Sequence, residues 1–269
     1  MTQKTPVFSI IMATCNAERH VRGALASVLE QSFPHYELLI QDNASTDQTL
    51  ACIEARASEA IHLVSTPDRG VYDAWNRALE RARGEWLLFL GADDRLYSPH
   101  VLARSARHLR NRGPEILFAQ GALALGRHGK HLECLNRSKC EIFRHFIAGM
   151  PLLVPAVFFH CRAFEQGFFD ANYAIAGDFA FVAQLLTPEN LALLPFVVSY
   201  MEAGGLSSSP KHRPQLLKER RRILEEIVKV RAGELVDYCI RTMEDQSAPF
   251  EDAAPLATEF ARDGLALFA

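Results

Sequence analysis

The chain of 269 residues has no apolar run long enough to span a bilayer. The longest candidate, PLLVPAVFF, contains two prolines and is much shorter than the roughly 20 residues that a transmembrane helix needs. The N-terminal apolar segment VFSIIMA is soon followed by charged residues, which is unlike a secretory signal peptide. We therefore expect a cytoplasmic protein, or one in peripheral contact with the inner face of the plasma membrane.

The chain also lacks a basic excess and any metal-binding pattern of cysteines. Its formal net charge is -3 at pH 7, whereas general nucleic-acid-binding proteins normally carry a net positive charge. We therefore expect no nucleic-acid partner. The six cysteines include no C-x-x-C pair, and the ten histidines show no metal-ligand spacing. Free thiols in a reducing compartment are the simplest interpretation.

Two common phosphate-binding loops are absent as well, because neither G-x-G-x-x-G nor G-x-x-x-x-G-K-[ST] occurs. What the sequence does contain, between Val7 and Gln120, is a regular alternation of apolar runs of strand length with segments of helical period. The apolar runs are FSIIMA, YELLIQ, AIHLVS, EWLLFL and EILFAQ. This alternation predicts an α/β fold with a mostly parallel central sheet and helices on both faces.

Local signals refine this pattern. Residues 45–48 read as a capping box, so Ser45 is expected to cap the following helix. The next helix is predicted from about Gly70 to Arg83, closed by Gly84. After Gln120 we expect a hairpin around residues 126–129, helices at 140–149 and 177–186, and strands at 151–159 and 191–200. From residue 213 onward only helix signals remain.

Polar groups follow four successive strands of the predicted sheet. They are Thr14-Cys15-Asn16, Asp42 to Ser45, Asp68-Arg69-Gly70 and Ala92-Asp93-Asp94. Ligands bind open α/β sheets at the carboxyl ends of the strands, so these groups are expected to form one site. The first two could hydrogen-bond a base and a ribose, and Arg69 could meet a phosphate. The aspartate pair offers hard oxygen ligands for Mg²⁺ or Mn²⁺, which would bridge a diphosphate.

Each of these features also has a purely structural interpretation. An isolated Asp-Asp pair is usually a solvated turn, and Asp42 or Asp178 could be a turn or helix-cap residue. Tyr72 and Trp75 are expected to pack on a helix face. For Asn76, a capping hydrogen bond and a ligand contact are equally consistent with the sequence. The alignment of four strand ends favours function for the aspartates.

Five blocks in order carry a resemblance to a known family. They are FSIIMATCN, QDNASTDQT, PDRGVYDAWNRAL with ARGEWLLFLGADD, FFDANYAIAGDFAF and GGLS. Over roughly residues 7 to 225 the chain resembles glycosyltransferase family 2, inverting enzymes of the GT-A fold. The DRGVYDAWNRA block is similar to a form seen in transferases that build bacterial surface polysaccharides.

The resemblance implies a role for each matching residue. Thr14, Asn16 and Asp42 would hold the nucleotide, while Asp68, Arg69 and Asn76 would lie near the donor diphosphate and sugar. Asp93 and Asp94 match the metal motif. Because neighbouring residues on an extended segment point in opposite directions, we expect Asp94 on the metal and Asp93 toward the ribose or sugar. Asp178 matches the catalytic base.

The resemblance also implies a division of the chain. We expect a GT-A domain over residues 1–212, with a nucleotide-sugar-binding half at 7–120 and an acceptor-side half at 121–212. A C-terminal helical extension covers 213–269. Its basic residues are expected to give weak contact with anionic lipid, partly offset by Glu219, Glu225 and Glu226. The alternative is an ordinary solvated helix with pairs such as Arg221 with Glu225.

Several positions depart from the family pattern. Ala92 precedes the aspartate pair, Val154-Pro155 replaces a frequent His-Gln pair, and Gln184 stands where an arginine is common. These differences leave the donor sugar and the acceptor open. The Q-x-x-R-W block of processive synthases is absent, which favours a single sugar addition.

We therefore predict an inverting hexosyl- or related glycosyltransferase that depends on Mn²⁺ or Mg²⁺. Its donor would be a nucleotide-sugar, with a UDP-sugar favoured. Its acceptor would be a glycan or lipid-linked oligosaccharide that becomes O-antigen, capsule or exopolysaccharide. One alternative is a sugar-nucleotide nucleotidyltransferase, although its glycine-rich basic loop is missing. The other is a nucleotide-binding module without turnover, although Asp42, Asp93, Asp94 and Asp178 are all present.

Overall fold

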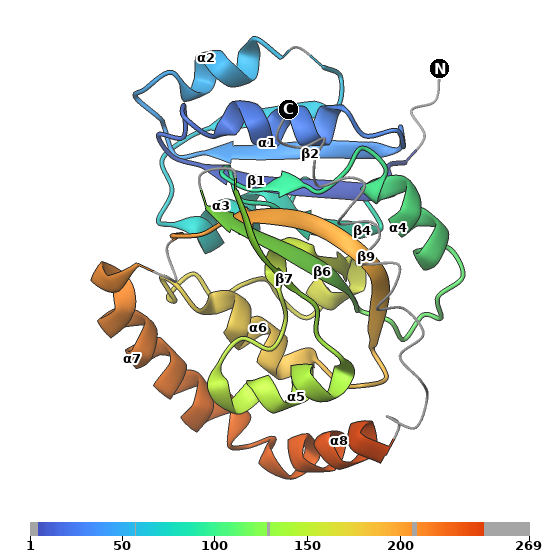
Figure 1. Ribbon diagram of the computed structural model, residues 1–269. Helices are drawn as coiled ribbons and strands as arrows, with labels where there is room; N and C mark the ends of the chain where they lie inside the picture. Colours follow the sequence, from blue (N-terminus) through green and yellow to red (C-terminus); the bar gives the residue numbers. More distant parts are fainter. Residues whose placement is uncertain (1–4, 57, 128–129, 206–208, 245–269) are drawn as a thin grey trace.

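The computed structural model describes residues 5–56, 58–127, 130–205 and 209–244, which contain a nine-stranded sheet with helices on both faces (Figure 1). The strands are β1 Phe8–Thr14, β2 Tyr36–Asp42, β3 Ile61–Ser65, β4 Trp86–Phe89, β5 Arg95–Leu96, β6 Phe118–Arg127, β7 Lys130–Leu135, β8 Val157–His160 and β9 Leu191–Glu202. The α-helices are α1 Val21–Leu29, α2 Thr49–Glu54, α3 Val71–Leu79, α4 Val101–Leu109, α5 Lys139–Ala148, α6 Gly177–Leu185, α7 Arg213–Ile223 and α8 Ala232–Glu244. Shorter helical segments are η1 Val154–Ala156, η2 Cys161–Phe164, η4 Pro210–His212 and the π-helical η5 Leu224–Val228.

The strand order is β3-β2-β1-β4-β8-β6-β9-β5, and β7 pairs with β6. The first four strands are parallel, and β6 and β9 also pair in parallel. Strand β8 lies antiparallel between β4 and β6. It therefore joins the N-terminal and C-terminal halves of the chain into one sheet, and the predicted α/β fold is confirmed.

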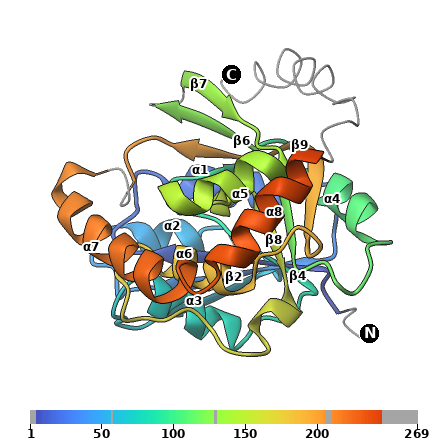
Figure 2. The same cartoon turned by 90° about the horizontal axis from the view of Figure 1, so that it is seen from below.

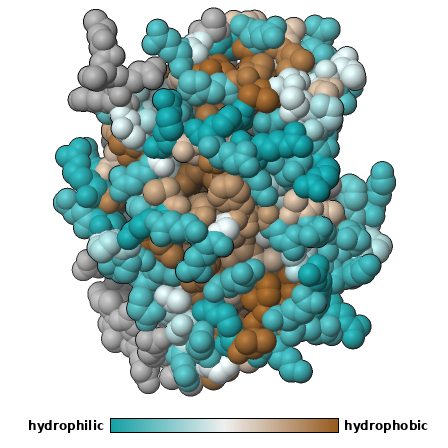
Figure 3. Space-filling model, turned by 180° about the vertical axis from the view of Figure 1, so that it is seen from behind, coloured by the Kyte–Doolittle hydropathy of each residue, from teal (hydrophilic) through white to brown (hydrophobic). Residues whose placement is uncertain are grey.

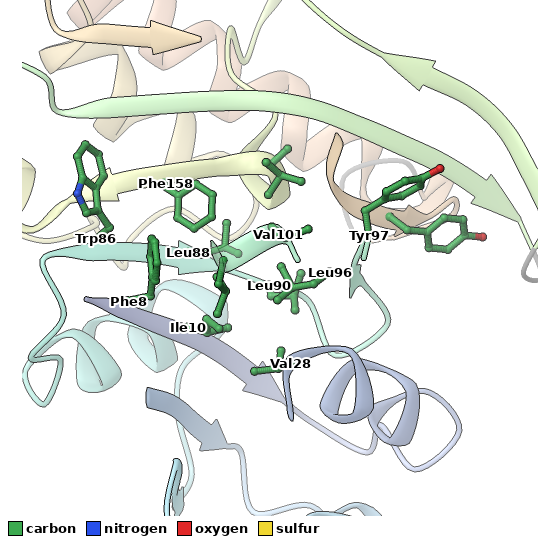
Figure 4. Close-up of a cluster of buried hydrophobic side chains, with 14 of the residues drawn as sticks. Phe8, Ile10, Val28, Trp86, Leu88, Leu90, Leu96, Tyr97, Val101 and Phe158 are labelled. Atoms are coloured by element: carbon green, nitrogen blue, oxygen red, sulfur yellow. The ribbon is translucent and has the colours of Figure 1, made fainter. Parts of the chain in front are cut away.

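Alternate side chains of the central strands pack into two hydrophobic cores, one on each face of the sheet. Ile10 and Met12 of β1 pack in a cluster with side chains of α1, α2 and α4, whereas Ile11 packs in a second cluster with side chains of α3, α5 and α6. Figure 4 shows the first cluster, with Phe8, Ile10 and Leu88 of adjacent strands beside Phe158. Burying apolar side chains on both faces is the main driving force for this sheet.

The last helices cover the part of the molecule opposite α1 and α2 (Figure 1). Figure 2 shows α5 and α8 side by side there, and the rings of Phe143 and Tyr238 are 5.6 Å apart between centroids. Figure 3 shows that the back of the molecule is mostly hydrophilic, with apolar residues in a few patches. Within the described residues, no helix has the length and hydrophobicity required to cross a bilayer.

The structure corrects two predicted helix boundaries. Helix α2 begins at Thr49 rather than after Ser45, and Asp47 Oδ1 accepts the hydrogen bond of Thr49 N at 2.9 Å. Helix α3 ends at Leu79, because the chain then turns so that Arg83 N and its guanidinium bind the buried Glu37. Gly84 does not close the helix. It packs so closely on β1 that a Cβ there would lie 2.4 Å from Ser9 N.

The second half follows the predicted elements with one difference. The hairpin forms between β6 and β7, although residues 128–129 at its turn lie outside the described residues, as do Leu206 and Ser207 of the GGLS block. The predicted strand at 151–159 pairs only over Val157–His160. Pro155 has no N–H to donate to a ladder, and residues 154–156 form a short 3₁₀ turn instead.

The C-terminal segment is helical as far as it is described. Arg221 Nε and Glu225 Oε1 form the expected pair at 2.9 Å. Glu219, one of the acidic residues expected to offset the basic charges, has a buried side chain. The domain boundaries and the contact with anionic lipid stay predictions. Five cysteines whose side chains are described are free thiols: Cys15, Cys52, Cys134, Cys140 and Cys161.

Candidate functional site

Three parallel strands end side by side at the edge of the sheet where the polar residues were predicted. In the strand register, Thr14 of β1 lies opposite Asp42 of β2, and Asp42 lies opposite Ser65 of β3. The chain leaving β4 stays beside β1, where Leu90 N donates to Ile11 O at 3.0 Å. The structure thus brings Thr14 and Asp42 together and directs the segment with the aspartate pair along the same edge.

Asp42 is a fully buried carboxylate at the centre of this edge. Its Oδ1 accepts hydrogen bonds from the hydroxyls of Thr14 (2.7 Å) and Ser45, and its Oδ2 accepts from Ser65 Oγ (2.7 Å) and Ser45 N (2.8 Å). Burial alone would raise the pKa of Asp42, but these donors outweigh it and hold the pKa below its usual range. Four donors fill the lone pairs of a carboxylate, so a base could bind Asp42 only by replacing one of them.

The loops after β1 and β2 are tied to each other. Asn16 N donates to Ser45 Oγ at 2.8 Å, and Asn16 Oδ1 accepts from Thr46 N at 2.9 Å. Asn16 has a φ of 49°, in the left-handed region that asparagine tolerates better than most residues. Ser45 was predicted as a helix cap, and that prediction is wrong. Its hydroxyl instead links Asp42 to Asn16.

The Asp68-Arg69-Gly70 turn forms the next loop of the site. Asp68 Oδ1 accepts from Gly70 N at 2.9 Å, and Asp68 N donates to Asn43 Oδ1 at 2.9 Å, which ties the turn to the loop after β2. Gly70 has a φ of 127°, a conformation that side chains disfavour. Burial raises the pKa of Asp68. The turn is therefore held both by its own hydrogen bond and by Asn43 of the neighbouring loop.

Arg69 lies mostly in solvent. Its side chain is 78% exposed, and its guanidinium is 3.3 Å from Asp73, which also pairs with Arg77 at 2.9 Å. Asp73 is buried, but the pair is weak because the Arg69 guanidinium is exposed to water and lies at a long distance from it. Arg69 can therefore leave Asp73 for an anion in the site, while Arg77 remains to balance the Asp73 charge.

The aspartate pair occupies a tight turn rather than an extended segment. Asp94 N donates to Gly91 O at 3.1 Å, which closes the turn. A Cβ placed on Gly91 would lie 2.7 Å from Asp94 Oδ2 and 2.8 Å from Asp93 Oδ1. Both carboxylates therefore approach the same side of the turn, and the argument that they point in opposite directions is wrong. The assignment of the metal to Asp94 stays a prediction.

Asp94 is the buried member of the pair. Its oxygens accept backbone N–H groups at long distances, from Gly91 at 3.2 Å and from Glu202 at the end of β9 at 3.3 Å. Burial, and then the neighbouring charge of Asp93, raise the pKa of Asp94 to about 7. A buried carboxylate with weak donors and a like charge beside it is an electrostatic setting that a cation would relieve.

Asp178 lies in the first turn of α6, so the prediction that it would precede this helix as a cap is wrong. Its Oδ1 accepts from Phe179 N at 2.8 Å and is 3.0 Å from Tyr72 Oη, which in turn is 2.6 Å from Ile175 O. Burial raises the pKa of Asp178. Within the described residues, no hydrogen bond engages Oδ2, so this oxygen can accept a proton from a ligand.

Asn76 makes its contacts within the protein. Its amide donates to Phe169 O at 2.8 Å and accepts from Phe169 N at 3.1 Å. Tyr72 is buried and both Tyr72 and Trp75 pack against Phe169, as expected of helix-face residues. The α3 helix therefore orients the segment that leads to Asp178. A direct contact of Asn76 with the donor stays a prediction.

Sequence reasoning missed two residues that build the site: Ser65 and Glu219. Ser65 could have been found, because the sheet register places the last residue of β3 beside Asp42. Glu219 carries no local signal, since it sits in a run of charged residues that reads as a solvated helix.

Comparison with known proteins shows the family of this chain. The sequence profile of Glycosyl transferase family 2 matches residues 9–129. The chain is 32% identical over 213 residues to the PGL/p-HBAD biosynthesis glycosyltransferase of Mycobacterium bovis (strain BCG / Pasteur 1173P2), covering 76% of this chain and 80% of that protein. This chain belongs to glycosyl transferase family 2. It is also 39% identical over 98 residues to the putative teichuronic acid biosynthesis glycosyltransferase TuaG of Bacillus subtilis (strain 168), covering 35% of this chain and 39% of TuaG.

Solved structures agree on the fold of this family 2 glycosyltransferase. S. aureus TarS 1-349 in complex with UDP-GlcNAc aligns with a TM-score of 0.63 and 18% identity, over 94% of this chain and 84% of that one. The mannosyltransferase PcManGT from Pyrobaculum calidifontis, in complex with GDP-Man and Mn2+, aligns with a TM-score of 0.61 and 19% identity, over 98% and 81%. The predicted GT-A fold is therefore confirmed.

Removing the Asp42 carboxylate should destabilise the fold. We expect Asp42→Ala to lower the free energy of unfolding by about 4 kcal/mol or more, because four hydrogen bonds lose their acceptor at about 1 to 3 kcal/mol each. Ser65→Ala removes one donor and should cost about 1 kcal/mol. Urea unfolding monitored by circular dichroism measures both. Equal, small effects of the two variants would contradict the central position of Asp42.

The raised pKa of Asp94 predicts a pH-dependent stability in EDTA. The unfolded carboxyl ionises near pH 3.8 and the folded one near pH 7, so the native state binds the extra proton between these values. Stability should therefore fall as pH rises through this window, by up to about 4 kcal/mol. Asp94→Asn should remove most of that loss, whereas Glu225→Gln should not. Urea titrations at pH 4.5 and 8 would test this, and identical pH dependence in Asp94→Asn and wild type would refute it.

Proposed function

We propose that this glycosyltransferase is inverting and transfers a single sugar from a nucleotide-diphosphate-sugar to a hydroxyl of a growing cell-surface glycan. The observation that carries the proposal is Asp178, a half-buried carboxylate with one oxygen that accepts no hydrogen bond from the described residues. On the donor side, Thr14 and Asp42 are hydrogen-bonded to each other at the strand ends, and the Asp93-Asp94 turn follows the neighbouring strand β4. The TarS complex with UDP-GlcNAc supports a UDP-sugar as donor.

The donor side is formed by the loops at the ends of the parallel strands. The nucleoside would lie against Thr14, Asn16 and Asp42, and a ring N–H of the base would take the place of one donor on Asp42. Asp68 and Arg69 would adjoin the diphosphate and sugar. Arg69 is suited to this because its guanidinium is exposed and would break only a weak ion pair with Asp73 to bind the diphosphate. These contacts follow the family resemblance position by position.

The Asp93-Asp94 turn fits a divalent cation of the Mn²⁺ or Mg²⁺ type. Both carboxylates approach the same side of the turn, and Asp94 is buried with weak donors. No group of three or more His, Cys, Asp or Glu side chains within the described residues could hold a metal by itself, so the diphosphate would have to supply further oxygens. When bound, such a cation would offset charge on the departing diphosphate. The PcManGT complex with Mn2+ supports this assignment.

Asp178 would act as the general base. An acceptor hydroxyl placed at Oδ2 gives its proton to the carboxylate while its oxygen bonds to the anomeric carbon, and the bond from that carbon to the diphosphate oxygen breaks. A single displacement from the opposite face inverts the configuration. The accepted proton is then on Oδ2. The Tyr72 hydroxyl and Phe179 N contact the other oxygen, Oδ1, where they would orient the carboxylate toward the acceptor.

The acceptor is proposed from the relatives and the sequence blocks together. TuaG is named for teichuronic acid biosynthesis and the mycobacterial relative for PGL/p-HBAD biosynthesis. The DRGVYDAWNRA block resembles the form in transferases of bacterial surface polysaccharides. The acceptor that is consistent with the two relatives and with the sequence block is a glycan or lipid-linked oligosaccharide. It would be extended by one sugar at the inner face of the plasma membrane.

Nucleoside-diphosphate binding should require a divalent cation. We expect calorimetric titration with UDP to give at least tenfold weaker affinity in EDTA than in Mn²⁺, because charge neutralisation at the aspartate pair is lost. Asp93→Asn and Asp94→Asn, measured separately, should identify the carboxylate that holds the cation. Glu225→Gln is the control. Equal UDP affinity of the wild type in EDTA and in Mn²⁺ would reject the metal site.

Asp178→Asn should separate chemistry from binding. Asparagine keeps the size of the side chain, so folding and UDP affinity in Mn²⁺ should stay near wild type. Release of nucleoside diphosphate from the sugar donor should fall by roughly 10²- to 10⁴-fold, the range a positioned base supplies. Steady-state assays with a panel of sugar nucleotides measure this. A near-normal rate would move the role of base to another carboxylate, with Glu165 and Asp170 the next to test.

A further inference from the structure

The segment that carries Asp178 is held by a carboxylate of the C-terminal helix α7. Glu219 Oε1 accepts from Ala174 N at 2.8 Å, and Glu219 Oε2 accepts from Ile175 N and Ala176 N, each at 2.9 Å. Three successive backbone N–H groups that point at one carboxylate form an anion-binding concavity. The segment ends two residues before Asp178, at the start of α6.

The Glu219 side chain is buried rather than at the surface. It is 5% exposed, and Gln215 Nε2, one turn earlier, donates to its Oε1 at 2.7 Å. Burial works against ionisation, but these hydrogen bonds outweigh it and keep the pKa of Glu219 below its usual value. The carboxylate is therefore ionised at neutral pH and holds the segment through charge-assisted hydrogen bonds.

The opposite side of the same segment is held by α3. Ile175 N donates to Glu219, while Ile175 O lies 2.6 Å from the hydroxyl of Tyr72, which also contacts Asp178. Asn76, one turn further along α3, binds both backbone groups of Phe169. One peptide segment is thus fixed between a helix of the donor-binding half and a helix of the C-terminal extension.

Two further residues of α7 act on the same region. Burial raises the pKa of Asp178, and the positive charge of Arg220, next to Glu219, lowers it in part. Ile223, one turn further, is fully buried in the core that contains Phe179 and Ala180 of α6. Helix α7 therefore packs on α6, holds the segment before it and contributes charge near the carboxylate.

We propose that Glu219 is a positioning residue for the base Asp178, and that α7 is consequently a working part of the acceptor side of the active site. This inference rests on the proposed role of Asp178. Glu219 touches neither donor nor acceptor. It fixes the backbone from which Asp178 projects, and a displacement of about 1 Å in a reacting group can cost on the order of 10²-fold in rate.

The test uses Glu219→Gln, which keeps the side-chain shape but presents an amide to the backbone donors. Glu225→Gln on the next turns is the matched control, because Glu225 only forms an exposed pair with Arg221. Donor hydrolysis in Mn²⁺ gives kcat and the donor KM, calorimetry gives the UDP affinity, and hydrogen exchange reports the amides of residues 174–176 without requiring activity.

We expect Glu219→Gln to speed exchange at residues 174–176 and to lower kcat by on the order of 10²-fold, with donor KM and UDP affinity within about twofold of wild type. The control should change none of these. A kcat at the wild-type level would overturn the proposal. So would a parallel loss of kcat and UDP affinity, which indicates general loosening of the fold.

Two further outcomes are decisive. If Glu219→Gln does not fold, Gln215→Ala removes one support of the carboxylate, and an unchanged kcat in that variant would overturn the proposal. If wild-type protein turns over no sugar nucleotide although it binds UDP, the proposed function fails instead. The positioning role of Glu219 is then tested by hydrogen exchange alone. Unchanged hydrogen-exchange protection of the amides of residues 174–176 in Glu219→Gln would overturn it.

Discussion

The site depends on one buried carboxylate that joins three strand ends. Asp42 is inaccessible to solvent, and it can stay ionised there only because the hydroxyls of Thr14, Ser45 and Ser65 and one backbone N–H point at it. Those donors come from the ends of β1 and β3 and from the loop after β2. Satisfying a single buried charge therefore fixes the relative positions of the loops that would receive the nucleotide.

Four buried or half-buried carboxylates follow two different electrostatic patterns. Asp42 and Glu219 each accept four hydrogen bonds from protein groups, and their pKa values lie below the usual range. Both hold neighbouring segments of the protein in place. Asp94 and Asp178 have fewer or weaker donors, and burial raises their pKa values. A carboxylate that the fold leaves incompletely satisfied is one that can still bind a cation or a proton. The pattern separates the framework of the site from the groups available for chemistry.

Local sequence predicted the individual elements well where hydrophobic periodicity alone determined the structure. The apolar runs became strands, and the order of polar groups after them placed Thr14, Asp42, Asp68 and the aspartate pair on successive strand ends. Predictions failed where another interaction competed, whether distant or local. Glu37 draws Arg83 out of α3, and Ser45 binds Asp42 instead of capping α2. A turn closed by Gly91 O brings Asp93 and Asp94 to the same side.

By itself, the sequence determined the α/β architecture and the candidate residues at the strand ends, because hydrophobic period and turn chemistry are local properties. Only the tertiary structure decided how Asp178 is held. Tyr72 is 106 residues away from it along the chain, and Glu219 stands in a charged run whose local pattern indicates an exposed helix face. Burying that carboxylate against three backbone N–H groups is a long-range event, and the sequence between the partners carries no periodic signal of it.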